Sequence, residues 1–418
     1  MFSVNYNIEI SNVTFATRGQ SNMNDKHRIL SIVSLFHAFN DGTLAVIPLL
    51  FPIFKTLFDL SYTEIGLITG GGLAIALFTE ISIGRVSDNN NSGTLLIIGA
   101  FLLSVSMFFL SFSKGFVTLL LIVFLLRFSS GFFHPIGIGL ISRTFKKDRL
   151  DWAMGMQSAF GDFGAFIAIL TTLYIAVNFG WIIPLYIWSI LGVGCLFIGI
   201  YLTSHTPKKY LISSYSKNKK QTFSESFFEW IQIIKRFRLL IPLFIVSGAS
   251  WGLTISYLSL FLDEKTNLAL YSIGIIVSLW IGIGSIVCLF YGKIQKHLRR
   301  KNIITFSYLT IGLMGFFLAF STNVLIIIII VILLGLSTFL TFPALFSFVS
   351  EATHETAEGK TFGYIFTIQS GIGTVLLFLS GVLADIFGIW IPFVLLGIVS
   401  LLATIIVYGN KKRLYFLN

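Results

Sequence analysis

Twelve long apolar runs constrain what this chain can fold into more than any other feature of its sequence. A helix needs about 20 apolar residues to cross the hydrocarbon core of a bilayer, and the runs are of about that length. They are continuous rather than alternating, which excludes the strands of a membrane β-barrel. We therefore expect an all-α integral membrane protein with 12 transmembrane helices, at 29–53, 64–86, 94–113, 115–143, 152–177, 181–203, 239–261, 271–291, 303–321, 324–349, 361–383 and 389–408.

The composition excludes the main soluble classes. Of the 418 residues, 55% are hydrophobic and 11% are charged, whereas about a quarter of an average soluble protein is charged. A soluble enzyme, a nucleic-acid-binding domain or a disordered chain would need many more polar residues. The two cysteines, Cys195 and Cys288, lie inside apolar runs. The sequence therefore implies neither a disulfide framework nor a metal site, and it implies no cofactor.

The basic residues indicate how the chain is oriented in the membrane. If the N-terminus is inside, 25 of the 29 Lys and Arg residues fall in inside segments. Three fall outside (Lys55, Lys114 and Lys265), and Arg127 lies within a span. Cytoplasmic loops carry an excess of basic residues, so we expect both termini to be cytoplasmic. The net charge of +11 then reflects topology rather than binding to nucleic acid.

A long polar loop divides the chain into two halves. We expect its second part, 223–238, to lie on the membrane surface because it is amphipathic. The polar N-terminal segment is expected to be a loose tail. The predicted organisation is a cytoplasmic tail at 1–27, a six-helix bundle at 28–203, a cytoplasmic loop at 204–238, a second six-helix bundle at 239–408 and a cytoplasmic tail at 409–418.

The two halves repeat with a shift of 208 residues and no gaps. Gly66 matches Gly274, Pro135 matches Pro343, and the Phe-Gly-x-x-x-Pro run at 179–184 recurs at 387–392. Glycine and proline matches are informative because other residues fill their backbone positions poorly. A 6+6 duplication is typical of secondary transporters, whose substrate site lies between the repeats near the membrane midplane.

Six ionisable residues lie within the spans, all of them in the first half. A charge at the bilayer centre costs about 2.5–3.5 kcal/mol on insertion scales, so such residues are expected to face a cavity or a partner. Helical spacing places several of them with polar neighbours on shared faces. The faces carry Ser34, His37 and Asp41 in span 1, Arg127, Ser130 and His134 in span 4, and Ser158 and Asp162 in span 5, while Glu80 lies near the inside end of span 2.

Asp41 and Arg127 are expected to be opposite-charge partners across a cavity. A carboxylate that alternates between an arginine neighbour and apolar surroundings can release and bind a proton. The alternative is that the two residues form a permanent structural pair. His37 and His134 are either contacts for substrate and protons or hydrogen-bonded packing residues.

Four stretches of the first half resemble a known family. They are His37-Ala-Phe-Asn40-Asp41, Phe58-Asp-Leu-Ser-Tyr-Thr-Glu-Ile-Gly66-Leu-Ile-Thr, Phe133-His134-Pro135 and Gln157-Ser-Ala-Phe-Gly161-Asp-Phe-Gly164. The chain resembles a major facilitator superfamily transporter over all its spans. Within that superfamily, the first half resembles the fosmidomycin-resistance-type exporters. The resemblance implies two six-helix bundles that rock around a central site.

The resemblance also assigns roles to single residues. Similar transporters have Gly-x-x-x-Asp and basic residues after span 2; Gly84 and Asp88 fit, but Asn89–Ser92 replaces the basic part. Asp88 is then expected to cap the next helix and latch the halves, with Arg85 as the basic substitute, unless Asp88 forms an ordinary turn. The arginine of the span-4 Arg-x-x-x-Gly motif, here Arg127, is tied to proton coupling in the family. Exporters tend to carry Gly-Pro in span 5, where this chain has Ala168-Ile169.

These observations predict a multi-pass transporter of the prokaryotic plasma membrane that exports a small organic solute or drug in exchange for protons. We expect it to be a monomer whose partners are its substrate, protons and the lipid bilayer, with no nucleic acid. The expected site residues are Asp41, Arg127, Asp162 and Glu80 for proton coupling, His37, Asn40, Arg127, Ser130, His134 and Gln157 for substrate binding, and Gly84, Arg85 and Asp88 for the latch.

Two alternatives remain open at this point. One is uptake of an organic anion bound by Arg127, which the missing Gly-Pro favours. The other is a receptor or scaffold that moves nothing, although a scaffold has no need of the buried charges. An enzyme is not expected, because the sequence has no metal cluster and no nucleophile–base pair. It has no nucleotide loop either, so ATP is not expected to drive transport.

Overall fold

The computed structural model describes residues 14–87, 90–145, 147–212, 231–232, 234–352 and 358–409, and these are helical except at the loops and turns. The helices are α1 (Thr14–Leu57), α2 (Tyr62–Ser87), α3 (Ser92–Leu110), α4 (Phe116–Ser130), α5 (Phe133–Thr144), α6 (Lys147–Phe179), α7 (Ile182–Ser204), α8 (Lys208–Leu211), α10 (Ile241–Lys265), α11 (Leu270–Leu289), α12 (Tyr291–His297), α13 (Arg300–Phe320), α14 (Val324–Ala352), α15 (Glu358–Phe387) and α16 (Ile391–Gly409).

The described residues contain 12 helical segments long and apolar enough to cross a membrane, which confirms the predicted fold class. The predicted spans match these segments to within a few residues at most ends. One expectation was wrong: the tail expected to be loose is helical from Thr14 onward and is continuous with the first span. The amphipathic stretch predicted at 223–238 lies mostly outside the described residues.

The fourth span is broken into α4 and α5 by a proline. Pro135 has no N–H to give to the carbonyl of Gly131, and its ring clashes with that carbonyl. The chain turns at Gly131 and Phe132, where the Phe132 N–H bonds to the Ser129 carbonyl, three residues back, at 3.3 Å. A new helix then starts at Phe133. The repeat-related Pro343 lies inside the continuous helix α14, so only the first half has this break.

The helix boundaries follow the repeat found in the sequence. Helices α2, α3 and α4 begin at residues 62, 92 and 116, and α11, α13 and α14 begin at 270, 300 and 324, each 208 residues later. Helices α6 and α15 both end at a phenylalanine followed by a left-handed glycine, Gly180 with φ 99° and Gly388 with φ 109°. A left-handed residue after a helix is usually glycine because a Cβ is disfavoured there. The duplicated glycines thus end equivalent helices.

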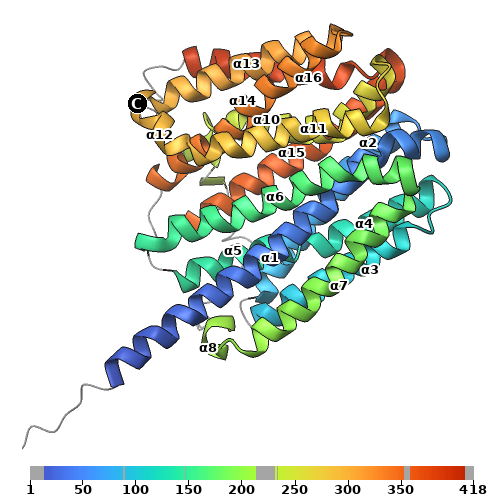
Figure 1. The fold of residues 1–418 in the computed structure, drawn as a ribbon. Coiled ribbons are helices and arrows are strands. Elements are labelled where there is room, and N and C mark those ends of the chain that lie inside the picture. The colour runs from blue at the N-terminus through green and yellow to red at the C-terminus, as the bar shows by residue number, and fades with distance from the viewer. Residues whose placement is uncertain are drawn as a thin grey trace, which may run out of the picture.

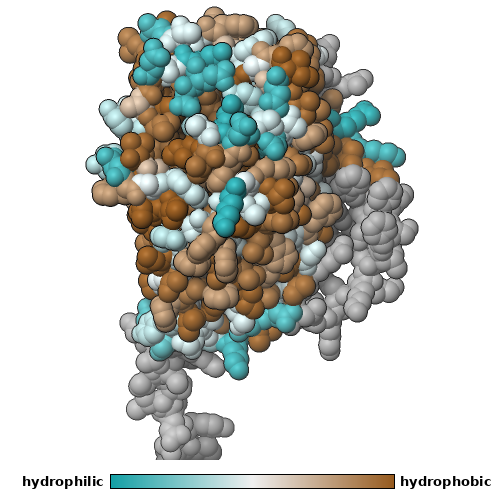
Figure 2. All heavy atoms as spheres, turned by 90° about the vertical axis from the view of Figure 1, so that its right-hand side faces the viewer, coloured by the Kyte–Doolittle hydropathy of each residue, from teal (hydrophilic) through white to brown (hydrophobic). Residues whose placement is uncertain are grey.

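The surface is unusually apolar for a folded chain. Phe78, Ile190 and Phe197 are 68%, 69% and 70% exposed, and many other large apolar side chains also face outward. In water such a surface would aggregate, whereas in a bilayer it faces lipid. Figure 2 views the end of the bundle where α1 leads to α2, with hydrophilic residues gathered on parts of this end and hydrophobic residues over much of the rest.

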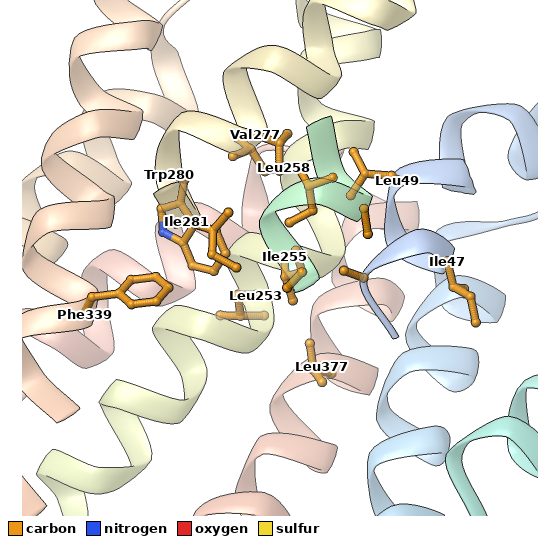
Figure 3. Close-up of a cluster of buried hydrophobic side chains, with 14 of the residues drawn as sticks. Ile47, Leu49, Leu253, Ile255, Leu258, Val277, Trp280, Ile281, Phe339 and Leu377 are labelled. Carbon is orange, nitrogen blue, oxygen red and sulfur yellow. The ribbon is translucent and has the colours of Figure 1, made fainter. Parts of the chain in front are cut away.

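Within the described part of the chain, the two halves pack against each other mainly through three pairs of helices. The pairs are α2 with α15, α6 with α11, and α1 with α10. In Figure 1 the first half (blue to green) and the second half (yellow to red) lie one above the other, with α6 along their boundary. Figure 3 shows apolar side chains from both halves at this boundary, where Leu49 of α1 lies near Leu258 of α10. The boundary is therefore part of the hydrophobic core.

Glycines bring the backbones of the two halves into close contact. A Cβ added to Gly66 of α2 would lie 3.1 Å from the Cα of Gly381 in α15. One added to Gly70 would lie 2.6 Å from the carbonyl oxygen of Thr374, in the same helix. Small residues allow such approach between membrane helices.

Polar contacts between the halves gather at one end of the bundle. The Asp385 carboxylate of α15 accepts hydrogen bonds from the backbone N–H groups of Tyr62 and Thr63, at 2.8 and 2.7 Å, and so caps α2. The Tyr62 hydroxyl donates to Glu264 of α10. Carboxylates are favourable at helix N-termini, where backbone N–H groups are unpaired. This cluster, which we call the outer latch, lies at the end predicted to be extracellular.

A further hydrogen bond between the halves depends on a proline in α1. Pro52 has no N–H, so the carbonyl of Pro48, four residues earlier, loses its usual helical partner. The Ser259 hydroxyl of α10 donates to this carbonyl at 2.7 Å. A neighbouring helix thus satisfies a backbone group that lipid cannot, and α1 is tied to the second half.

Candidate functional site

Three potential ligand groups predicted to face a cavity come together inside the first half. Helical spacing in α1 brings the His37 Nε2 to 3.1 Å from the Asp41 Oδ2. His134 lies in the first turn of α5 and joins them. One ring nitrogen of each histidine and one carboxylate oxygen of Asp41 all lie within 4.8 Å of one another. The His37 side chain is 8% exposed and that of Asp41 is 28% exposed. We call His37, Asp41 and His134 the central cluster.

The hydrogen bonds of His37 fix its tautomer. Its Nδ1 lies 2.8 Å from the carbonyl oxygen of Gln157 in α6. A carbonyl can only accept a hydrogen bond, so the Nδ1 carries a proton and donates it. The Nε2 then faces the Asp41 carboxylate, which also only accepts when it is ionised. Two acceptors cannot bond to each other, so a proton lies between these two atoms, carried by either the imidazole or the carboxylate.

Neighbouring residues hold the central cluster in place. The amide of Asn40 donates to the other Asp41 oxygen at 2.9 Å, and the ring of Phe133 stacks on that of His37 with centroids 4.5 Å apart. Gly161 of α6 faces the cluster, where a Cβ would lie 2.7 Å from His37 Nε2 and 2.9 Å from Asp41 Oδ2. Only glycine leaves room for both side chains at this position.

Arg127 does not form the ion pair with Asp41 that the sequence suggested. Within the described residues, His37 is the cationic partner within 4.0 Å of Asp41, and the buried Nε of Arg127 has no hydrogen-bond partner. The Arg127 stem packs over Gly72 of α2, where a Cβ would lie 2.9 Å from its Cγ. Asp41 and Glu80 are the acidic groups that act on its charge. The permanent structural pair considered above is therefore absent from this structure.

Two other predicted substrate contacts, Ser130 and Gln157, differ in whether their polar atoms already have hydrogen-bond partners. The Ser130 hydroxyl is buried and donates to the carbonyl of Arg127 at 2.9 Å, so it serves its own helix. The Gln157 side chain is 3% exposed. Its amide nitrogen donates to Ser158 at 2.9 Å, but its Oε1 is buried without a partner among the described residues. A buried acceptor of this kind needs a ligand, a water or an ion.

Asp162 lies at the boundary between the halves rather than in the central cluster. Its charge acts on Cys288 of α11, and it interacts with the Ser285 hydroxyl of the same helix. One turn farther along α6, the Phe166 ring lies 2.8 Å from the position of a Cβ added to Gly282 of α11. The structure therefore places Asp162 where α6 of the first half packs against α11 of the second.

Two polar residues of the second half were not predicted, because the predicted site was built around the ionisable residues, and these all lie in the spans of the first half. Ser285 Oγ and Gln369 Oε1 are buried, and neither has a conventional hydrogen-bond partner in the described part of the chain. Gln369 of α15 packs against Gly248 of α10, where a Cβ would lie 2.6 Å from its side chain. An amide within an apolar span is itself a signal that could have identified Gln369 from the sequence.

The predicted latch after α2 is only partly visible. Gly84 lies near the end of α2, whereas Asp88 and the side chain of Arg85 lie outside what the structure describes. The capping role expected of Asp88 therefore lies outside the described residues. Asn91 caps α3, accepting from the N–H groups of Gly93 and Thr94 at 2.9 and 3.2 Å. Asn91 directly precedes the first helical residue, the position from which a side chain reaches these groups.

A small cavity lies beside the central cluster, within the first half. Asn40 and Phe133 line part of it, and the rest is mostly apolar: Phe36, Phe39, Leu96, Gly99, Ala100, Leu103, Ser129 and Phe132. Its walls come from α1, α3, α4 and α5 and the α4–α5 turn, so it lies away from the boundary between the halves.

Twelve spans in two repeated halves, with buried charges in one half and helix pairs joining the two, define a secondary transporter rather than an enzyme. Comparison with known families gives the same result. Residues 30–377 match the Major Facilitator Superfamily, and the chain belongs to that superfamily.

The chain is also similar to several individual proteins. It is 25% identical over 369 residues to the Protein TsgA homolog of Buchnera aphidicola, covering 85% of this chain and 89% of that one. It is 24% identical to the uncharacterized MFS-type transporter MJ1317 of Methanocaldococcus jannaschii, covering 84% and 87%. Similarity to the uncharacterized MFS-type transporter YfnC of Bacillus subtilis is 28% identity, but over only 36% of this chain and 37% of that one.

Solved structures share the fold at low sequence identity. A mutant form of the nucleoside transporter NupG superposes with a TM-score of 0.76 at 14% identity, over 92% of this chain and 99% of that one. A bacterial homolog of the human lysosomal transporter Spinster, in an inward-facing and occupied conformation, gives 0.74 at 14% identity, over 92% and 96%. These likenesses show the fold alone.

Proposed function

We propose that this transporter couples export of a small organic solute or drug to the entry of protons through the central cluster. The observation that carries the proposal is the short His37–Asp41 contact, at 3.1 Å, with the Nδ1 of His37 fixed on a carbonyl. That arrangement holds a proton in a region where unpaired charge is costly. Asp41 is the proposed proton-binding group, and Asp162 and Glu80 are proposed relay groups.

Arg127 is the proposed switch for the proton on Asp41. Its Nε is buried and unpartnered among the described residues, so the guanidinium keeps bonding capacity that a second state can use. If α4 moves Arg127 onto Asp41, the arginine charge replaces the proton, which then leaves. Alternating access would thus exchange a proton for an arginine contact, with substrate binding deciding which is favoured.

The proposed orientation places both termini in the cytoplasm of a prokaryotic cell, with the chain in the plasma membrane. In this orientation the outer latch joins the halves at the extracellular end, which supports an inward-facing state. We propose that the transporter works as a monomer, because each half supplies its own core and the site needs no second copy. The resemblance of the first half to fosmidomycin-resistance-type exporters supports the direction of transport.

A second candidate function is uptake of an organic anion. The buried Nε of Arg127, unpartnered within the described part of the chain, supports it, because arginine binds carboxylates and phosphonates through paired N–H groups. The Arg127→Lys variant keeps the charge but loses the paired N–H groups. We expect the rate of uptake of such an anion to fall by at least about tenfold. If an exported cationic substrate leaves Arg127 free of substrate contact, the same variant changes proton coupling but not substrate affinity.

The direct test is transport in liposomes that hold a trapped pH dye. Proton gradients of each sign are imposed, and lipophilic drugs and organic anions are added in turn. Substrate-dependent proton flux opposite to the substrate supports export by exchange. Flux in the same direction as the substrate replaces this proposal with uptake.

The control for this experiment is Asp41→Asn, which keeps the size of the side chain but cannot lose a proton. We expect it to abolish substrate-dependent proton flux. Proton flux that is unchanged in this variant would refute the role of Asp41. Substrate binding without movement of substrate or protons, in a well-folded protein, would instead support a receptor.

A further inference from the structure

The central cluster has the composition of a transition-metal site, although the sequence predicts none. His37 and Asp41 are one helical turn apart, but His134 comes from another span. The fold brings the three donor atoms within 4.8 Å of one another. We infer that His37, Asp41 and His134 bind a divalent first-row transition-metal ion such as Zn²⁺ between their side chains.

The distances need little adjustment for a metal ion. Zinc lies about 2.0–2.2 Å from its nitrogen and oxygen ligands, so tetrahedral ligand atoms are roughly 3.3–3.5 Å apart. The His37–Asp41 pair is already at 3.1 Å. Bringing His134 from the outer limit of 4.8 Å requires a shift of about 1.4 Å. Rotation of one side chain provides a shift of that size.

The atoms around the cluster orient its ligand groups. Metal-binding histidines almost always donate their other ring N–H to a carbonyl or carboxylate. His37 does this through its contact with the Gln157 carbonyl at 2.8 Å, which turns its Nε2 toward Asp41. Asn40 in turn holds the second oxygen of Asp41 at 2.9 Å. Both contacts position ligand atoms before an ion arrives.

The donor set selects the kind of ion. Two imidazoles and one carboxylate suit zinc, cobalt, nickel or copper, whereas magnesium and calcium require oxygen ligands. Three protein ligands leave a fourth position open. The buried Oε1 of Gln157 has no partner within the described residues, and this side chain also interacts with His37. This oxygen is a candidate for that position, with water as the alternative.

The charge balance explains why ion and proton exclude each other. The Asp41 oxygen and the His37 Nε2 each direct a lone pair into the space between them once the proton leaves. Either the proton or the metal satisfies both atoms, and the two cannot occupy 3.1 Å together.

The test is a titration of the full-length protein in detergent, purified without a polyhistidine tag. Co²⁺ is added first, because a tetrahedral site gives visible absorption bands, and Zn²⁺ is then used to displace it. We expect one equivalent of Co²⁺ in the wild type, displaced by one equivalent of Zn²⁺. This readout needs no transport, so the inference does not depend on the proposed function.

Ligand variants locate the site, and a surface variant controls for other histidines. Asp41→Asn and His134→Gln each remove one ligand, and we expect each to weaken binding by at least about tenfold. His297→Gln changes an exposed histidine at the end of α12 and should leave binding unchanged. Gel filtration and a thermal unfolding transition establish that each variant is folded.

Three results would overturn the inference. One is a folded wild-type protein that binds no equivalent of Co²⁺ or Zn²⁺. Another is binding that His134→Gln or Asp41→Asn leaves unchanged. The third is loss of the bound equivalent in His297→Gln, which would place it on the surface.

Discussion

At the scale of single residues, the central cluster depends on what surrounds His37. Its contact with Asp41 follows from spacing along one helix. Its contacts with Gln157 and Phe133 come from α6 and α5, about a hundred residues away in sequence. These contacts, rather than the histidine alone, fix the tautomer and the direction of its Nε2. The chemistry of this site is therefore sensitive to changes that alter no charge.

Gly161→Ala tests this dependence without removing a functional group. The added methyl would lie 2.7 Å from His37 Nε2 and 2.9 Å from Asp41 Oδ2, so both side chains must move. We expect substrate-driven proton flux in liposomes to fall by at least about tenfold, because small displacements of reacting groups have large effects. Gly155→Ala is the matched control, since a Cβ on that residue of the same helix meets nothing within 4 Å. Equal flux in the two variants would contradict the geometry.

At the scale of elements, the sequence predicted the spans well and their interruptions less well. Continuous apolar runs specify where helices cross the membrane, and that part was confirmed. The break at Pro135 was not predicted from the sequence. A proline alone does not identify such a break, since Pro48, Pro52 and Pro343 lie within continuous helices. Whether a proline breaks a helix depends on what else bonds the freed carbonyl, as Ser259 does for Pro48. That partner comes from the other half and cannot be read from local sequence.

The outer latch gives a prediction at the same scale. Asp385→Asn removes the charge that caps α2 from the other half. Hydrogen bonds to charged groups contribute about 1.5–3 kcal/mol, and asparagine retains part of this. We expect a loss of about 1–2 kcal/mol, which shifts the balance between inward-facing and outward-facing states by roughly 5- to 30-fold toward outward-facing.

Distances between spin labels measure that shift. Labels at exposed positions 114 and 267 report on the separation of the two halves at the proposed outer end. The distribution should gain a longer distance in Asp385→Asn. Asp59→Asn is the control, because Asp59 is an exposed carboxylate in the α1–α2 turn with no cross-half hydrogen bond among the described contacts. An unchanged distance distribution in Asp385→Asn would mean that the outer latch does not stabilise the inward-facing state.

At the scale of the whole molecule, the repeat was readable because glycines and prolines mark backbone positions. Gly180 and Gly388 have positive φ at equivalent helix ends, which is why both copies kept glycine. How the halves meet was not readable, because it depends on packing between helices far apart in sequence. For this reason Asp162 was predicted as part of a buried site but not as a neighbour of α11.

The distribution of basic residues gives a prediction about the whole chain in its membrane. With 25 of 29 Lys and Arg residues on one side, we expect both termini in the cytoplasm. Reporter fusions at each terminus, one active only in the cytoplasm and the other only outside it, provide the measurement. Activity of the outside reporter at either terminus would contradict the proposed topology.

The central claim is that the proton on the His37–Asp41 pair couples transport to the proton gradient. The most direct test compares two modes of transport in Asp41→Asn, using a substrate identified in the liposome assay. Exchange of labelled for unlabelled substrate moves no net protons, whereas gradient-driven accumulation requires them. We predict that the variant retains exchange and loses gradient-driven accumulation. Gradient-driven accumulation at the wild-type rate would contradict the claim.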